Sequence, residues 1–237
     1  MRRAGLTCLV AAGLAASIAP AVVAATGPQV RQLVVFKRGA LLEKSVRASA
    51  TTRRVGRRRC EIGRGTALAA LSRSRPGRIV LRDYGSCGRR AADAGGIYVR
   101  QIRTDRARGQ AGWVYKVGRR LATAGAADPA GAFGRGRLRS RQRVTWFYCT
   151  LRAGSCQRTL ELRANAGPGG VVSATVTGYD DDGRGVAVAG AEVRGGGASA
   201  TTGSDGRATL TLPPGTHRLR ARRAGLVASF AQRVTVL

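Results

Sequence analysis

Residues 143–163 read RVTWFYCTLRAGSCQRTLELR, and apolar and polar side chains alternate on both sides of a short connection. Alternation with a period of two is typical of β-strands, and Gly154 in the connection is typical of a turn. We therefore predict two strands joined as a hairpin. Cys149 and Cys156 stand at the ends of these strands, where a disulfide would staple them together.

The same alternation recurs along the chain, whereas a helical pattern occurs once. Thr66 is a natural N-cap before ALAALSRS (67–74), and Pro76 ends that run. Further strands are predicted at 30–36, 78–81, 97–102, 113–117, 171–179, 191–194, 207–212, 217–222 and 227–236. The fold class is therefore mostly β with one short helix: an α+β, β-grasp-like domain followed by a small all-β sandwich.

The stretch ANAGPGG (164–170) has little to bury and marks a predicted linker at 165–170. It divides the chain into a disulfide-bonded, β-grasp-like domain with an N-terminal β-hairpin, residues 26–164, and a β-sandwich, residues 171–237. A sandwich of this size has a thin core, so we expect it to lean on its neighbour.

The first 25 residues have the pattern of a secretory signal peptide. Arg2 and Arg3 precede an Ala-rich apolar run at 6–18, and Val23-Ala24-Ala25 offers small residues for cleavage. A retained N-terminal anchor is the alternative, but Pro20 breaks the run short of the roughly 20 residues that a membrane span needs. We expect a secreted protein, either free or associated with the cell envelope.

Four cysteines remain after this leader: Cys60, Cys87, Cys149 and Cys156. An even number in an exported chain indicates disulfides, for which three pairings exist. The Cys149–Cys156 pair follows from the predicted hairpin and leaves Cys60 to pair with Cys87. A zinc site is not expected, because there is no CxxC motif and the single histidine, His217, lies far along the chain.

The charge is strongly basic, with 42 Lys and Arg against 12 Asp and Glu and a net charge of +30. All but three of the cations are arginine, in a chain that is also rich in Gly and Ala, which is typical of a genome rich in G and C. The alternative is a surface selected for a polyanion. Outside the cell that partner would be an anionic cell-wall polymer or acidic lipid rather than nucleic acid. The arginines cluster at 53–54, 57–59, 137–143 and 218–223.

No catalytic or metal-binding constellation can be assembled from the sequence, so we expect neither enzyme activity nor a cofactor. The carboxylates of the first domain are scattered without a paired motif. The run Asp180-Asp181-Asp182-Gly183 favours a hairpin turn over a calcium loop, because the twelfth position from Asp180 is Ala191 rather than Glu.

Four aromatic residues are the candidate ligand-binding residues. Trp113 and Tyr115 lie two apart on one predicted strand, and Trp146 and Tyr148 lie two apart on another, so each pair shares a face of its strand. Together they could form a stacking platform for a small planar ligand. The alternative, which we favour, is that they are core residues.

Two stretches of the chain are similar to known families. GWVYKVG (112–118), GAADPAG (125–131) and QRVTWFY (142–148) resemble the transcobalamin-like C-terminal β-grasp family, over residues 60–162. This resemblance implies a β-grasp fold and, by analogy, a face that holds a cofactor-like ligand of the corrinoid type.

The second resemblance covers residues 171–237. GAEVRG (190–195) and TTGSDGRATLTLPPGTHRLRARRAG (201–225) resemble the carboxypeptidase regulatory-like domain, a transthyretin-type β-sandwich. Such modules are accessories without peptidase activity. We therefore expect a secreted binding or adhesion module, or alternatively an extracellular small-ligand binding protein.

Overall fold

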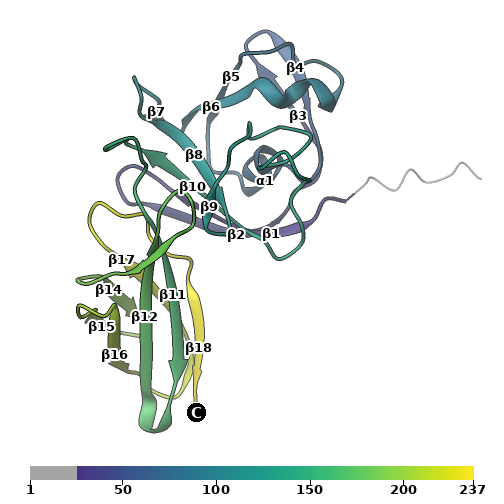
Figure 1. The fold of residues 1–237 in the computed structure, drawn as a ribbon. Coiled ribbons are helices and arrows are strands. Elements are labelled where there is room, and N and C mark those ends of the chain that lie inside the picture. The colour runs from purple at the N-terminus through teal and green to yellow at the C-terminus, as the bar shows by residue number, and fades with distance from the viewer. Residues whose placement is uncertain (1–25) are drawn as a thin grey trace, which may run out of the picture.

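The computed structural model describes residues 26–237, so the predicted signal peptide at 1–25 lies outside the described residues. Figure 1 shows two lobes, with the N-terminal lobe above and the C-terminal strands β11 to β18 below. The fold is mostly β with one α-helix among the described residues, which is the predicted class. Within this part of the chain no helix is long and apolar enough to cross a membrane.

The upper lobe is built around a five-stranded sheet of order β2-β1-β10-β8-β9. Its two central strands, β1 and β10, run parallel, and antiparallel neighbours flank them on both sides. The strands are β1 (Gln29–Val35), β2 (Leu41–Arg47), β8 (Gly112–Val117), β9 (Arg120–Leu121) and β10 (Arg143–Cys149).

The helix α1 (Ala67–Ser74) begins and ends where the sequence predicts. The Thr66 hydroxyl accepts a hydrogen bond from the backbone N–H of Ala69 at 3.2 Å, which satisfies one of the free donors at the helix start. At the other end Arg75 adopts a left-handed φ of 53° and closes the helix before Pro76. The apolar residues of α1 are buried in the same core as the central sheet.

Two smaller sheets complete the upper lobe. The disulfide between Cys60 and Cys87 joins β4 to the segment before η1, with the pairing that the sequence predicts. The backbone N–H of Glu61 on β4 also donates to the backbone oxygen of Gly88 at 2.9 Å. The segment around Cys87 and Gly88 therefore holds β4 by both a disulfide and a hydrogen bond. The elements are the β3–β4 hairpin (Thr51–Val55, Arg58–Ile62) and a sheet of β5 (Ile79–Asp83), β6 (Ile97–Ile102) and β7 (Asp105–Arg106), with the 3-10 helix η1 (Ala91–Gly96) before β6.

The lower lobe is a β-sandwich of two four-stranded sheets. One sheet has the order β11-β12-β13 with β16 beside β12, and the other has the order β15-β14-β17-β18. Its core consists of Val, Leu and Ala side chains without an aromatic residue. The strands are β11 (Thr159–Ala166), β12 (Val171–Tyr179), β13 (Gly185–Ala187), β14 (Glu192–Gly195), β15 (Ala198–Thr201), β16 (Arg207–Thr211), β17 (Gly215–Arg222) and β18 (Gln232–Val236).

The structure corrects the predicted domain boundary. Strand β11 pairs along its whole length with β12, so the predicted linker at 165–170 is the end of β11 followed by the turn of a hairpin inside the sandwich. Gly169 and Gly170 take positive φ values of 64° and 77° in this turn, which suits a Gly- and Pro-rich stretch as well as a linker would. The predicted domains 26–164 and 171–237 therefore divide the second lobe one strand too late.

The predicted hairpin of 143–149 with 158–163 is wrong for the same reason, because β10 and β11 belong to different sheets. The chain crosses from one lobe to the other between Thr150 and Arg158. The disulfide between Cys149 and Cys156 has the predicted pairing, with an S–S distance of 2.04 Å, and closes this crossing. It therefore joins the ends of the connection between the lobes.

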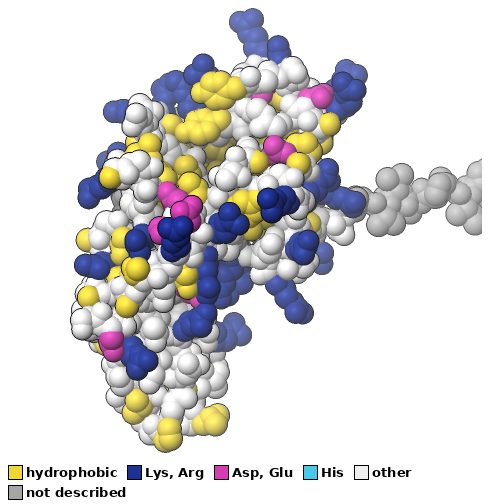
Figure 2. Space-filling view, viewed as in Figure 1, with side chains coloured by type: hydrophobic (Ala, Val, Ile, Leu, Met, Phe, Trp, Pro, Cys, Tyr) yellow, Lys and Arg dark blue, Asp and Glu magenta, His cyan; other side chains and the backbone are white. Residues whose placement is uncertain are grey.

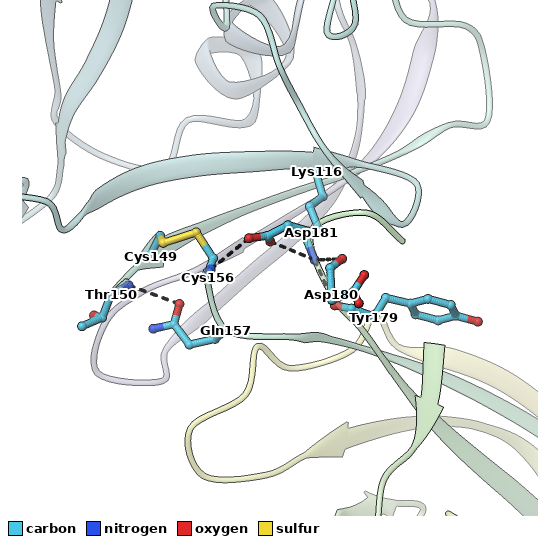
Figure 3. The surroundings of a disulfide bond; sticks show 8 residues. All are labelled: Lys116, Cys149, Thr150, Cys156, Gln157, Tyr179, Asp180 and Asp181. Atoms are coloured by element: carbon cyan, nitrogen blue, oxygen red, sulfur yellow. Dashed lines mark hydrogen bonds and ion pairs between the residues drawn. A yellow bond between two sulfur atoms is a disulfide. The ribbon is translucent and has the colours of Figure 1, made fainter. Parts of the chain in front are cut away.

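A buried lysine holds the crossing against the sandwich (Figure 3). Lys116 on β8 is fully buried, and its Nζ donates to the backbone oxygens of Tyr179 at 2.9 Å and Asp180 at 2.7 Å. The carboxylate of Asp181 lies 3.6 Å from the same Nζ and accepts the backbone N–H of Cys156 at 2.9 Å. Desolvation lowers the pKa of Lys116, and the Asp181 carboxylate opposes that shift.

A buried carboxylate makes a second contact between the lobes. Glu43 on β2 accepts from Arg31 at 2.8 Å, from Arg220 at 2.6 Å and from the backbone N–H of Ala231 at 2.9 Å. Burial alone would raise the pKa of Glu43, but these three hydrogen bonds outweigh it and lower the pKa below its ordinary value. Lys116 and Glu43 therefore each connect the two lobes through hydrogen bonds and ion pairs to the opposite lobe.

Candidate functional site

The four aromatic residues singled out in the sequence come together in the core of the upper lobe. Trp146 lies opposite Tyr115 in the β8–β10 ladder, and Tyr148 lies opposite Trp113. The Tyr115 and Trp146 rings are stacked at 5.0 Å, and the Trp113 and Tyr148 rings meet edge to face at 6.0 Å. All four are less than 10% exposed, so they do not form an open platform.

Three of these residues nevertheless line a cavity of about 290 Å³. Trp113, Tyr115 and Trp146 contribute to its wall, whereas Tyr148 does not. The cavity lies between β6 and β8, and its lining is mostly apolar and aromatic, as is usual for small-molecule sites. Residues from the end of β9, from the loop after it and from the end of η1 complete the wall: Leu121, Ala122, Ala124, Gly125, Ala126, Gly95 and Gly96.

Hydrogen bonds fix the tyrosines around this cavity. The Tyr115 hydroxyl donates to the backbone oxygens of Ala124 and Gly125, at 3.0 and 3.2 Å, and thereby ties β8 to the loop that closes the cavity. Burial raises the pKa of Tyr115 well above its ordinary value, so the phenol stays protonated. Trp146 is 1% exposed, and its Nε1 has no hydrogen-bond acceptor among residues 26–237.

The arginines of the β3–β4 hairpin form a second candidate site, which we call the arginine hairpin: Arg53, Arg54, Arg57, Arg58 and Arg59. Arg54 lies directly opposite Arg59 in the ladder, and both are exposed. Within the described chain none of the five has a carboxylate within 4.0 Å. Figure 2 shows Lys and Arg side chains projecting over both lobes on the drawn face, with few acidic side chains between them.

Two acidic side chains of the upper lobe hold turns. Asp83 accepts the backbone N–H groups of Gly85 and Cys87, at 3.0 and 2.9 Å, and Asp128 accepts that of Ala130 at 2.8 Å. The run beginning at Asp180 connects β12 to β13, and Asp180 accepts the backbone N–H of Arg184 at 2.8 Å. Between Thr26 and Leu237, no three His, Cys, Asp or Glu side chains gather closely enough to hold a metal ion.

No family model, curated protein or solved structure matches this chain. The two resemblances noted in the sequence therefore stay predictions.

Two aromatic residues that reach the surface beside the cavity, Tyr84 and Tyr98, were not predicted from the sequence. Tyr84, just after β5, is 67% exposed and lies 6.4 Å from the Tyr98 ring on β6. Both line the cavity. The alternation of RIVLRDY (78–84) with IYVR (97–100) places both tyrosines on the outward face and could have revealed them.

Proposed function

We propose that this chain is an exported, non-catalytic binding module that holds an anionic polymer of the cell envelope through the arginine hairpin. The observation that carries the proposal is the Arg54–Arg59 pair. Like charges directly opposite each other in a ladder are destabilising. Neither guanidinium has a carboxylate partner in the described part of the chain, so a polymer that supplies anions would relieve the repulsion.

The placement of the acidic residues supports a selected surface over a uniform compositional background. Glu43 is shared by Arg31, Arg218 and Arg220, and Glu161 is shared by Arg119 and Arg163. Glu61, the one acidic residue of the arginine hairpin, accepts instead from the hydroxyl of Thr52. The two carboxylates that are each shared by several arginines thus lie where the lobes meet, and the carboxylate of the hairpin does not neutralise its arginines.

The disulfides support the exported location. Two disulfides in a chain of this size are typical of proteins that fold in an oxidising compartment. The signal-like leader at 1–25 also supports export. An envelope polymer is therefore a partner that the protein would meet.

Retention on immobilised polyglycerol phosphate tests this function, with neutral dextran as the control matrix. The double variant Arg54→Gln, Arg59→Gln should bind about tenfold more weakly and elute at lower salt, because two unpaired charges are lost and the remaining ones are screened. The matched control is Arg194→Gln, Arg207→Gln. It removes the same charge from exposed arginines that already lie 3.9 Å from carboxylates.

The control variant should stay within about twofold of the parent protein, since locally neutralised arginines contribute little to a screened attraction. If the two variants lose the same amount of affinity for polyglycerol phosphate, retention depends on net charge alone and not on the arginine hairpin. Retention of the parent protein that does not respond to salt would contradict the electrostatic proposal altogether.

A second candidate function is the binding of a small planar ligand, and the cavity beside Trp113, Tyr115 and Trp146 favours it. A ligand that binds only the folded protein raises its melting temperature. A thermal-shift screen with corrinoids and smaller planar compounds tests this function. A melting temperature that no compound in the panel changes would retire it.

A further inference from the structure

The β5–β6 hairpin presents two arginines and two tyrosines on its outward face. Arg82 lies opposite Tyr98 in the ladder, Tyr84 follows Arg82 by two residues, and Arg100 follows Tyr98 by two residues. Side chains two apart on a strand share a face, so Tyr98 and Arg100 project to the same side as the opposite Arg82. Tyr84, just after β5, lines the same hollow as these three. The other face is buried in the core and carries Leu81, Ile97 and Val99.

The two tyrosines separate two adjoining hollows. Behind them lies the apolar cavity of about 290 Å³, and beside them lies a hollow of about 330 Å³ lined by Arg82, Arg100, Ala107 and Gly109. Tyr84 and Tyr98 contribute to both walls. A molecule that passes the tyrosines would therefore meet an apolar chamber at one end and two guanidinium groups at the other.

The position of Tyr98 depends on a close approach to β8. A Cβ at Gly112 would lie 2.1 Å from the Tyr98 hydroxyl oxygen, so only glycine leaves room for this ring. Desolvation raises the pKa of Tyr98, so its phenol stays neutral beside the arginines. The ring thus forms a fixed, uncharged wall between the hollows.

The arginines at the mouth lack acidic partners. Neither Arg82 nor Arg100 has a carboxylate within 4.0 Å in the described residues. The Arg82 guanidinium lies 4.7 Å from the Tyr84 ring centroid, a cation–π distance that keeps the charge beside the exposed tyrosine. Planar guanidinium groups in this setting are suited to a carboxylate or a phosphate.

We propose that this site binds an amphipathic organic acid, with its apolar body in the chamber between β6 and β8 and its anionic head on Arg82 and Arg100. The inference refines the small-ligand function and does not depend on polymer binding. The same chemistry is offered by an aromatic acid and by a fatty acid, so the test includes both.

Tryptophan fluorescence reports binding directly, because both tryptophans of the chain, Trp113 and Trp146, line the chamber. The probes are 3-phenylpropanoate, its neutral analogue 3-phenylpropan-1-ol, and octanoate. We expect 3-phenylpropanoate to bind at least tenfold more tightly than the alcohol. The variant Arg82→Gln, Arg100→Gln should abolish this difference and leave the affinity for the alcohol unchanged, whereas Arg194→Gln, Arg207→Gln should preserve it.

The outcomes separate the head-group inference from the small-ligand function. Equal affinities of the parent protein for the acid and the alcohol would overturn the inference and leave the function standing. Binding of none of the three probes would overturn both. If octanoate binds more tightly than 3-phenylpropanoate, the inference holds for a fatty acid, and the reverse order supports an aromatic acid.

Discussion

The junction between the lobes and the arginine hairpin differ in the partners of their positively charged side chains. At the junction Lys116 is fully buried and surrounded by backbone oxygens and Asp181, and the Glu43 side chain is only 9% exposed and holds several arginines. In the hairpin Arg54 and Arg59 face each other in solvent without an acidic partner. The difference teaches that the carboxylates at the junction hold the two lobes together, whereas the arginines of the hairpin have no acidic partner among residues 26–237 and, as we propose, bind another molecule.

Removal of the disulfide that anchors the arginine hairpin should have the largest effect on stability. Cys60→Ser with Cys87→Ser opens a loop with a sequence separation of 27 residues. On the chain-entropy estimate this lowers the free energy of unfolding by about 3.5 kcal/mol. Chemical denaturation of the double variant measures the loss. An unchanged midpoint would show that the hairpin is held by its packing alone.

Lys116→Met tests the junction and should cost about 3 kcal/mol. The substitution leaves the oxygens of Tyr179 and Asp180 without their donor and the carboxylate of Asp181 without its counter-charge. Lys44→Met, at an exposed residue of β2, is the matched control and should change stability by less than about 0.5 kcal/mol. Similar denaturation midpoints for the two variants would remove Lys116 from the account of the junction.

Glu43→Gln should cost about 2 kcal/mol at pH 7, since it weakens charge-assisted hydrogen bonds to Arg31, Arg220 and the Ala231 backbone. Because the folded-state pKa of Glu43 lies below its ordinary value of 4.5, its stabilising effect is present above pH 4.5 and is lost as the pH falls through the folded-state pKa. The gap between parent and variant should therefore close in acid. A gap that stays constant from pH 7 to pH 3 would contradict this origin.

Arg54→Gln with Arg59→Gln should have the smallest effect on stability, a gain of at most about 0.5 kcal/mol, because it removes a like-charge pair from the ladder. Thermal and chemical unfolding measure this change. A loss of more than about 1 kcal/mol would mean that these arginines stabilise the fold and are not surplus.

Local sequence patterns predicted the elements of the fold well. Thr66 and Pro76 bound the helix because capping and ring constraints act over a few residues. The two cysteine pairs also agree with the structure. Local patterns could not decide which sheet receives β11, since its alternation is the same beside β10 or β12.

Local sequence patterns also could not predict which residues are buried between the lobes. Lys116 alternates with the core residues Tyr115 and Val117, so its side of β8 appears solvent-facing in the sequence until the sandwich covers it. The candidate site was predicted only in part. Three of the four aromatics line the cavity, whereas Tyr84 and Tyr98 were overlooked because they stand among arginines.

The most direct test of the account measures stability and polymer retention on the same protein. For Arg54→Gln, Arg59→Gln we predict an unfolding free energy equal to or slightly above that of the parent protein, together with about tenfold weaker, salt-sensitive binding to polyglycerol phosphate. Unchanged binding, or weaker binding that appears only with a destabilised fold, would contradict the claim that the arginine hairpin is reserved for an external anion.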